Sequence, residues 1–155
     1  MALVTLLCGP AGSGKTTYAR RLALDGAVRL SMDEVIYDDG WHQEEPPGER
    51  LDELYGGLKD ELRRVVSEGG DVVVDLSMSE RSVRDEWRAL ATEAGAQVEL
   101  VVLTAPFEVL WQRVKRRNDV EEANAMRFTE SRLQIYVDDF DWPQPDEDHR
   151  VVETG

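Results

Sequence analysis

The chain has 155 residues, a formal net charge of −14 and a single cysteine. This length predicts one domain, 1–155, large enough to bury a core. The negative charge, with no block of lysine and arginine, argues against nucleic acid as a partner, and one cysteine excludes an intrachain disulfide. The sequence shows no signal-peptide pattern and no apolar run long enough to cross a membrane, so we expect a cytoplasmic protein with no membrane partner.

The first element is an apolar run, Leu3–Cys8, that predicts a buried strand, and a helix over 14–25 is expected soon after it. The segment between them fits G-x-x-x-x-G-K-[ST], the Walker A motif or P-loop, in the strand-to-helix context that this motif requires. Lys15 would reach the β- and γ-phosphates of ATP, and the Thr16 hydroxyl would ligate Mg²⁺. The predicted nucleotide-binding residues are Gly9, Pro10, Ala11, Gly12, Ser13, Gly14, Lys15, Thr16 and Thr17.

Asp33 lies just beyond a predicted short strand, 27–31. A carboxylate there could accept the proton of an acceptor hydroxyl as the hydroxyl attacks the γ-phosphate, which is the work of a general base. The alternative is an N-cap for the helical turn that follows.

An acidic, proline-rich stretch, 38–48, predicts a loop before a long helix over 49–68. Trp41 and His42 in this loop could line an acceptor pocket, or Trp41 could anchor the loop with His42 exposed. The pair Gly56-Gly57 weakens the helix by about 1 kcal/mol per glycine.

Asp75 closes a buried strand over 71–75, which is the Walker B pattern of apolar residues ending in an acid. It would hold Mg²⁺ beside Thr16, and the alternative is a solvated strand end. Ser77-x-x-Glu80 resembles a capping box that opens a helix ending at Gly95. Arg81 and Arg84, early in that helix, indicate either a nearby anion or acidic partner, or a salt bridge.

Arg113 and Arg117 share one face of a helix that starts at Pro106, after a strand over 98–103. We expect them to belong to a lid, approximately 113–128, that stabilises charge on the γ-phosphate. The alternative is that they complement the carboxyl end of their helix. A last helix near 129–140 and a strand over 150–153 complete the chain.

Alternating strands and helices predict an α/β fold with a parallel sheet and helices on both faces. Ligands bind such sheets at the carboxyl ends of the strands. The P-loop, Asp33, Asp75 and the start of the Pro106 helix all fall at that edge.

In the order and content of these motifs, the sequence resembles the small AAA-type P-loop kinases that include polynucleotide 5′-kinases, zeta-toxin-like kinases and chloramphenicol phosphotransferase. The shared features also include Arg84 and the segment Phe140-Asp141-Trp142-Pro143 with Glu147. The resemblance implies a three-layer, adenylate-kinase-like P-loop NTPase fold with a five-stranded sheet of order 2-3-1-4-5 and a lid. It also implies ATP and Mg²⁺ as cofactors, and phosphate transfer to a hydroxyl. Asp33 would be the general base, Arg113 and Arg117 would be lid arginines, and residues 146–152 would help to enclose the adenine.

The sequence departs from the family pattern in two features: Ile36 stands where polynucleotide kinases commonly carry a phosphate-gripping arginine, and Leu76-Ser77-Met78 follows Asp75 where many relatives have Ala-Thr-Asn. We therefore expect an ATP-dependent kinase acting on a small hydroxylated molecule, as a monomer or small homo-oligomer. The acidic loop 37–49 suggests a neutral or cationic acceptor, with an ordinary solvated loop as the alternative. A polynucleotide 5′-hydroxyl kinase, a zeta-toxin-like nucleotide-sugar kinase and a nucleotide-binding regulatory module with little turnover are the remaining candidates.

Overall fold

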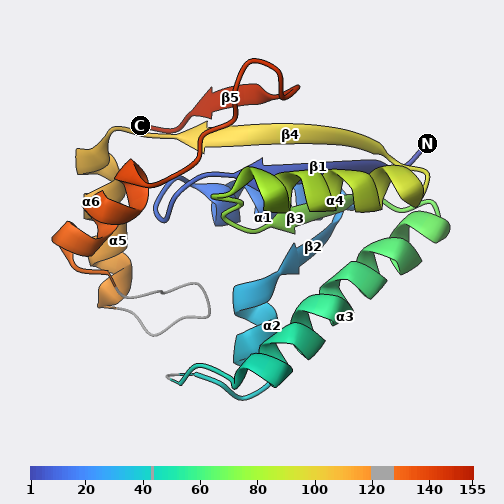
Figure 1. Cartoon of the computed structure of the whole chain (residues 1–155), viewed down its shortest axis with the longest axis horizontal. Coiled ribbons are helices and arrows are strands. Elements are labelled where there is room, and N and C mark those ends of the chain that lie inside the picture. Colours follow the sequence, from blue (N-terminus) through green and yellow to red (C-terminus); the bar gives the residue numbers. More distant parts are fainter. Residues whose placement is uncertain (43, 120–127) are drawn as a thin grey trace.

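Five parallel strands form one sheet in the order β2-β3-β1-β4-β5, which confirms the predicted topology. The computed structural model describes residues 1–42, 44–119 and 128–155. The strands are β1 (Leu3–Cys8), β2 (Val28–Ser31), β3 (Val72–Asp75), β4 (Gln97–Thr104) and β5 (Arg150–Glu153). All five run in the same direction, so their carboxyl ends meet at one edge of the sheet (Figure 1).

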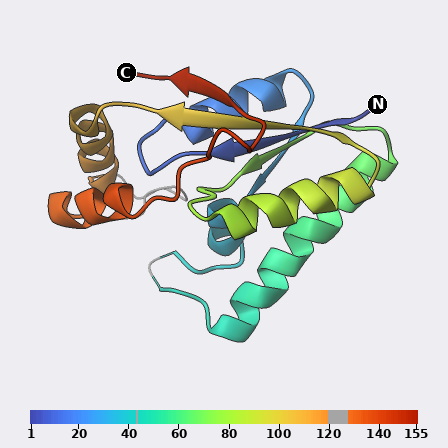
Figure 2. The ribbon, with the colours of Figure 1, turned by 45° about the horizontal axis from the view of Figure 1, so that its top comes forward.

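Some helices cover the two faces of this sheet, and others lie at its carboxyl edge. They are α1 (Lys15–Leu24), α2 (Met32–Asp38), α3 (Gly48–Ser67), α4 (Arg81–Glu93), α5 (Phe107–Asn118) and α6 (Glu130–Asp138). Helix α1 lies on one face, while α3 and α4 lie on the other (Figure 2). Helices α5 and α6 pack together beyond the strand ends. No helix in the described ranges is long and apolar enough to cross a membrane.

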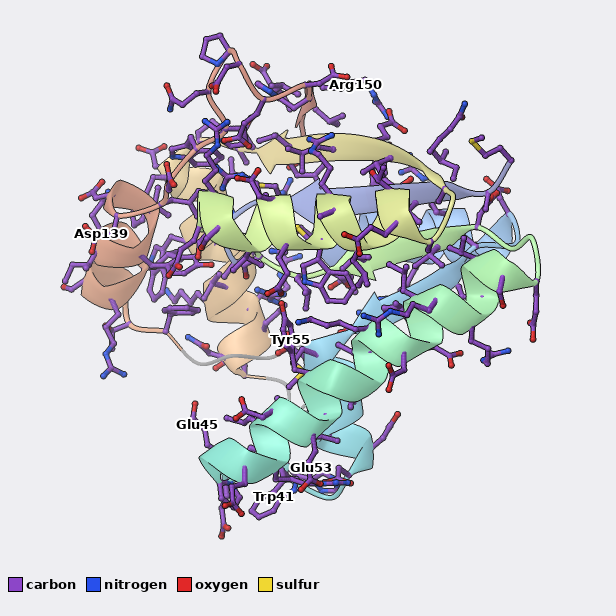
Figure 3. All side chains as sticks on the ribbon, turned by 45° about the vertical axis from the view of Figure 1, so that its right-hand side comes forward. Trp41, Glu45, Glu53, Tyr55, Asp139 and Arg150 are labelled. Carbon is purple, nitrogen blue, oxygen red and sulfur yellow. The ribbon has the colours of Figure 1, made fainter. Side chains whose placement is uncertain are left out.

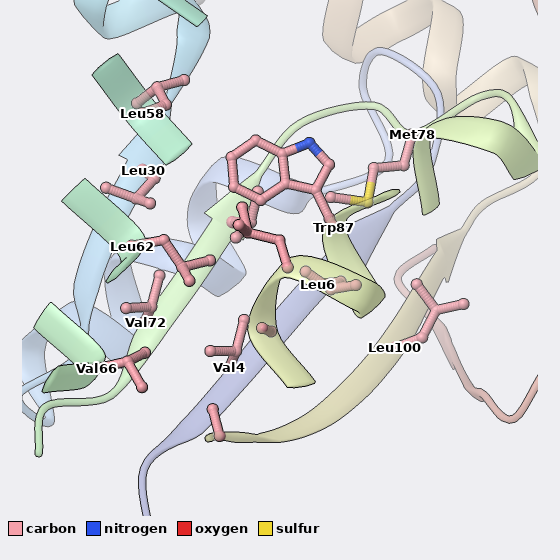
Figure 4. Close-up of a cluster of buried hydrophobic side chains, with 14 of the residues drawn as sticks. Val4, Leu6, Leu30, Leu58, Leu62, Val66, Val72, Met78, Trp87 and Leu100 are labelled. Atoms are coloured by element: carbon pink, nitrogen blue, oxygen red, sulfur yellow. The ribbon is translucent and has the colours of Figure 1, made fainter. Parts of the chain in front are cut away.

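The two faces of the sheet have separate apolar cores because successive strand residues point to opposite sides. Val4 and Leu6 of β1 pack with α3 and α4, whereas Leu7 packs against α1. Trp87 of α4 is fully buried among the first group (Figure 4), and its Nε1 donates to the Tyr55 hydroxyl at 2.8 Å. Burial on both faces explains why β1 is a continuous apolar run.

Helix α3 extends through Gly56 and Gly57, as predicted from its apolar spacing. Leu54, Leu58 and Leu62 are buried on one face of the helix, and this burial outweighs the weakening by the two glycines.

The loop before α3 is anchored by a cluster of charged and aromatic side chains. Trp41 Nε1 and Arg50 Nε donate to the Asp39 carboxylate at 3.0 and 2.8 Å, and Arg50 also donates to Glu53. Trp41 and Glu53 lie together at the start of α3 (Figure 3). His42 stacks on Tyr37, with ring centroids 4.1 Å apart. Trp41 therefore anchors this loop, as one of the two interpretations of the sequence expects.

The predicted capping box at Ser77 and Glu80 is wrong. Helix α4 begins at Arg81, and its N-cap is Glu80, whose side chain makes no capping hydrogen bond. The backbone carbonyl of Ser77 instead accepts from the Gly9 N–H at 3.1 Å, so this stretch runs along the P-loop before the helix starts. The Arg81 N–H is satisfied by the Asp141 carboxylate at 3.2 Å, from a distant part of the chain.

The C-terminal segment, residues 140–155, is fastened to α4 by arginine–carboxylate pairs. Arg84 is 1% exposed and donates to both oxygens of Glu147 at 2.8 and 2.9 Å. It also donates to the backbone carbonyls of Met78 and Asp141. The more exposed Arg81 pairs with Asp146 at 2.8 Å. Both predicted arginines thus have acidic partners within the chain.

Candidate functional site

The P-loop joins β1 to α1 at the carboxyl edge of the sheet, and its shape requires glycine at two points. Gly12 adopts a φ of 85°, and a Cβ there would lie 2.8 Å from the Leu110 carbonyl oxygen. A Cβ on Gly9 would lie 2.6 Å from the Leu103 carbonyl oxygen. Only glycine allows this close backbone approach, which turns the loop tightly toward α1.

The amino end of α1 is free to receive an anion. Its N-cap, Gly14, has a left-handed φ of 99° and provides no side-chain cap, and the first turn holds no acidic residue. The N–H groups of that turn have no partner within the helix, and they carry the positive end of the helix dipole. A triphosphate fits this arrangement because its oxygens would accept from these donors.

Lys15 curls back over the loop, as a P-loop lysine should. Its Nζ donates to the carbonyls of Gly9 and Pro10 at 2.8 and 3.1 Å. Burial, together with the charge of Arg117, lowers the pKa of Lys15 to about 8, while the charges of Asp75 and Asp33 oppose this shift. A phosphate group placed here would favour the charged ammonium.

Thr16 and Asp75 meet where the magnesium site is predicted. The Thr16 hydroxyl donates to Asp75 Oδ2 at 3.3 Å, and Asp75 is 7% exposed. A hydroxyl and a carboxylate are hard oxygen donors of the kind that Mg²⁺ prefers, so these two residues fit the ion. Asp75 is therefore not a solvated strand end.

Arg29 also engages Asp75, and the sequence analysis missed it. Its Nη2 and Nε donate to Asp75 Oδ2 at 2.7 and 2.9 Å. Ser31 pairs with Asp75 in the register of β2 and β3, and Arg29 lies two residues earlier on the same face. The two-residue spacing of Arg29 and Ser31 is visible in the sequence. It points to Asp75 only once the register of β2 and β3 is known, and that register comes from the fold.

Asp33 lies in the first turn of α2 and faces the same space as Lys15, Thr16 and Asp75. Ser31 is the N-cap of α2, because its hydroxyl accepts from the Glu34 N–H at 3.3 Å, so Asp33 does not have that role. Asp33 borders a cavity of about 230 Å³. Asp33 as a whole residue is exposed, but desolvation of its carboxyl group by the surrounding protein raises the pKa of that group. Repulsion from Asp75 raises this pKa further. Lys15, Arg117 and Arg29 oppose this rise.

Part of the lining of this cavity is apolar and aromatic, which the sequence analysis did not anticipate. Its members come from α2, the segment after β3, and the region of α6: Met32, Leu76, Phe128 and Tyr136. The rings of Phe128 and Tyr136 are 5.7 Å apart, and Tyr136 also packs edge-on against Phe140. Burial raises the pKa of the Tyr136 hydroxyl, so it stays neutral.

A second cavity, of about 270 Å³, lies on the outer side of the P-loop. Its polar lining is strongly basic despite the acidity of the whole chain, since four arginines border it: Arg20, Arg113, Arg116 and Arg117. Arg117 borders both cavities, one lined by Asp33 and both lined by P-loop residues. This placement suits a residue that interacts with phosphate groups.

Arg113 connects the P-loop to the C-terminal segment. Its guanidinium donates to the Gly12 carbonyl at 2.9 Å and to the Thr154 hydroxyl at 2.8 Å, as well as to the Thr154 carbonyl. The Thr154 hydroxyl in turn donates to the Ser13 carbonyl at 2.7 Å. Thr154 therefore lies against the P-loop, just beyond the range 146–152 that the resemblance implies for the adenine, while Asp146 and Glu147 are engaged with α4.

The predicted lid, 113–128, is only partly within the described residues. Residues 113–118 belong to α5, and 120–127 lie outside the described residues. Asn118 Nδ2 donates to the Phe128 carbonyl at 2.8 Å, and the Phe128 N–H donates to Asn118 Oδ1 at 3.3 Å. Asn118 and Phe128 are therefore held side by side.

Comparison with known proteins identifies the same architecture. A family model described as an AAA domain matches residues 4–143. A search of curated proteins finds no match. Among solved structures, a chain of the Pnkp1/Rnl/Hen1 RNA repair complex superposes with a TM-score of 0.75 at 21% identity, over 90% of this chain and 44% of that chain.

Two further structures match over most of their length. A gluconokinase from Sinorhizobium meliloti 1021 has a TM-score of 0.63 at 21% identity, covering 97% of this chain and 81% of that one. Kti12 from Chaetomium thermophilum, in complex with ADP-AlF3, has a TM-score of 0.69 at 18% identity, with 97% and 88% covered. These likenesses show a P-loop kinase fold. The chain spans 44% of the chain from the Pnkp1/Rnl/Hen1 RNA repair complex, and 38% of a matching chain from another structure of a Pnkp1/Rnl/Hen1 complex.

Proposed function

We propose, since the chain belongs to the AAA domain family and has the P-loop kinase fold, that it is an ATP-dependent phosphotransferase. It would move the γ-phosphate of ATP to a hydroxyl group of a small molecule, with Mg²⁺ required. The observation that carries this proposal is that one cavity joins the phosphate-binding residues Lys15 and Thr16 to a carboxylate, Asp33.

Asp33 has the environment expected of a general base. Its pKa is raised by its surroundings, and a base is most effective when its pKa approaches the working pH. In the proposed step, the acceptor hydroxyl oxygen bonds to the γ-phosphorus, its proton passes to the Asp33 carboxylate, and the bond to the β-phosphate oxygen breaks to release ADP.

The other charged residues would stabilise the phosphate groups. Lys15 and the amino end of α1 would hold the phosphate chain, and Arg117 would lie against the transferred group from the side of α5. Thr16 and Asp75 would hold Mg²⁺, which when bound neutralises charge on the phosphates. Arg113 would position the P-loop backbone through its bond to the Gly12 carbonyl and its link to Thr154.

The acceptor would be a small molecule with an apolar or aromatic face. The lining of the cavity includes Met32, Leu76, Phe128 and Tyr136. The residue one helical turn after Asp33 is Ile36, which offers no charge to a substrate phosphate. A cavity of about 230 Å³ suits a compact molecule or one end of a larger one.

The test is a screen of hydroxylated metabolites and antibiotics with γ-labelled ATP, in which 5′-hydroxyl oligonucleotides form a separate arm. We expect label on a neutral or cationic small molecule. Label only on anionic small molecules would contradict the apolar acceptor site. Label only on oligonucleotides would make the protein a polynucleotide kinase, and nucleotide binding without label on any acceptor would favour a regulatory module.

A further inference from the structure

The pair between Arg29 and Asp75 is buried at the centre of the candidate site. The side chains of Arg29 and Asp75 are 14% and 5% exposed, and the guanidinium makes two bonds of 2.7 and 2.9 Å to the same carboxylate oxygen. That oxygen, Oδ2, also accepts from the Thr16 hydroxyl. Three donors thus converge on one oxygen of the acid that is expected to support the metal.

A guanidinium and a divalent cation at the same carboxylate oxygen repel each other, and the repulsion is strong where solvent is largely excluded. In the nucleotide-free protein, Arg29 already neutralises Asp75. A metal ion arriving alone would have to displace it or share its carboxylate. A metal ion arriving with ATP brings phosphate oxygens that offset its charge, which is how Mg²⁺ commonly enters phosphate-transfer sites.

Arg29 also has a second carboxylate within reach. Its Nη1 lies 3.4 Å from Glu34 Oε1, on α2, and the Glu34 side chain is 35% exposed. The guanidinium can therefore transfer part of its interaction from Asp75 to Glu34 without leaving the site. Arg29 could thus stay paired with a carboxylate in both states, with Asp75 in the nucleotide-free protein and with Glu34 in the nucleotide-bound protein.

We propose that Arg29 is a positioning residue that orients and neutralises Asp75, so that divalent metal binds the protein as its complex with the nucleotide and not alone. This inference rests on the proposed role of Asp75 in metal binding. Its test needs neither an acceptor nor phosphate transfer, so it can fail while the proposed phosphotransferase activity stands.

The test compares Mn²⁺ binding to nucleotide-free wild-type protein and to Arg29→Gln, measured by the loss of the free Mn²⁺ signal in electron paramagnetic resonance. We expect Arg29→Gln to bind Mn²⁺ at least about tenfold more tightly, because the competing cation is gone. The double variant Arg29→Gln/Asp75→Asn should lose this gain. Glu34→Gln is the matched control, since it removes another partner of Arg29 and leaves the Asp75 pair in place.

Thermal unfolding separates this role from a merely structural pairing of β2 with β3. Arg29→Gln leaves a buried carboxylate without its main partner, so it should be destabilised, and Mg²⁺ alone should restore part of its Tm while leaving that of the wild type almost unchanged. Arg29→Lys keeps the charge and should resemble the wild type in both measurements. Unchanged Mn²⁺ affinity in Arg29→Gln, or a loss of Tm that Mg²⁺ does not repair, would overturn the proposal.

Discussion

The C-terminal segment and the phosphate-binding edge each hold a buried arginine–carboxylate pair, but only the phosphate-binding edge also holds charged groups, Lys15 and Asp33, whose charged forms their surroundings disfavour. In the C-terminal segment, Arg84 and Glu147 are both almost fully buried and bond each other twice. This hydrogen bonding lowers the pKa of Glu147, so the charged form is the stable one. At the phosphate-binding edge, the surroundings disfavour the charged forms of Lys15 and Asp33.

The difference shows which charges serve the fold and which are held for a ligand. A charge whose partner lies within the chain stabilises the folded state, and its loss is felt in stability. A charge held without a sufficient partner lowers stability until a ligand arrives, which is a common property of functional sites. Variants in the two regions should therefore affect different measurements.

The largest effect on stability is expected for Arg84→Ala. Removing this arginine leaves the Glu147 carboxylate buried without its main partner and removes the bond to the Asp141 carbonyl. We expect a loss of about 3–5 kcal/mol in the free energy of unfolding, measured by urea denaturation. Arg81→Ala is the matched control three residues away, because Arg81 is 40% exposed, pairs with the exposed Asp146 and reaches Glu147 only at 3.6 Å, so it should contribute less than about 1 kcal/mol. Equal losses in the two variants would contradict the assignment of Arg84.

Lys15→Met should show the reverse pattern. Phosphate transfer should fall by a factor of about 10²–10³ or more, because the variant loses a charge aimed at the phosphates. The free energy of unfolding should stay the same or rise, since a half-buried charge has been removed. Steady-state kinetics and urea denaturation check the two parts, and a strongly destabilised variant with normal transfer would reverse the comparison.

The pH dependence of the free energy of unfolding tests whether the charge of Lys15 destabilises the folded protein. Burial lowers the pKa of Lys15 from 10.5 to about 8, so between these values the unfolded chain binds more protons than the folded protein. The contribution of Lys15 to the free energy of unfolding should therefore rise with pH across this range, by about 1–2 kcal/mol after solvent screening.

Cys8 and Tyr55, whose pKa values burial raises to about 11 and about 12, act in the opposite direction at alkaline pH. The quantity to measure is thus the difference in stability between wild type and Lys15→Met at each pH, which isolates Lys15. A difference that stays flat from pH 8 to 10.5 would contradict the lowered pKa.

The smallest effect is expected for Thr154→Val, where the two regions meet. The variant loses the hydroxyl that donates to the Ser13 carbonyl and accepts from Arg113. ADP affinity, measured by calorimetry, should fall by a few-fold, which corresponds to about 1 kcal/mol. Thr92→Val is the control, because its hydroxyl donates to the Arg88 carbonyl of its own helix, away from the P-loop. An equal change in both variants would remove Thr154 from the support of the P-loop.

The sequence was sufficient wherever a signal is local or periodic. The P-loop is a contiguous motif, and Asp33 and Asp75 follow predicted strands, so the topology rule for parallel sheets placed all three at one edge. The sheet order followed from the resemblance and is confirmed.

The remaining features depend on contacts between distant segments. Arg29 meets Asp75 through the register of β2 and β3, and Asp141 caps α4 from sixty positions along the chain. The Ser77 capping box was wrong for the same reason, because a backbone bond to Gly9 takes Ser77 along the P-loop. The aromatic wall at Phe128 and Tyr136 forms only when α6 packs beside α5, which no local pattern states.

The most direct test of the central proposal is a comparison of Asp33→Asn with the wild type, using the acceptor found in the screen. Binding of ATP, measured by calorimetry, should stay within a few-fold, because Lys15, Thr16 and the loop backbone are untouched. Transfer of the γ-phosphate should fall by about 10²–10⁴. Transfer at the wild-type rate would remove Asp33 from the mechanism and contradict the proposed general base.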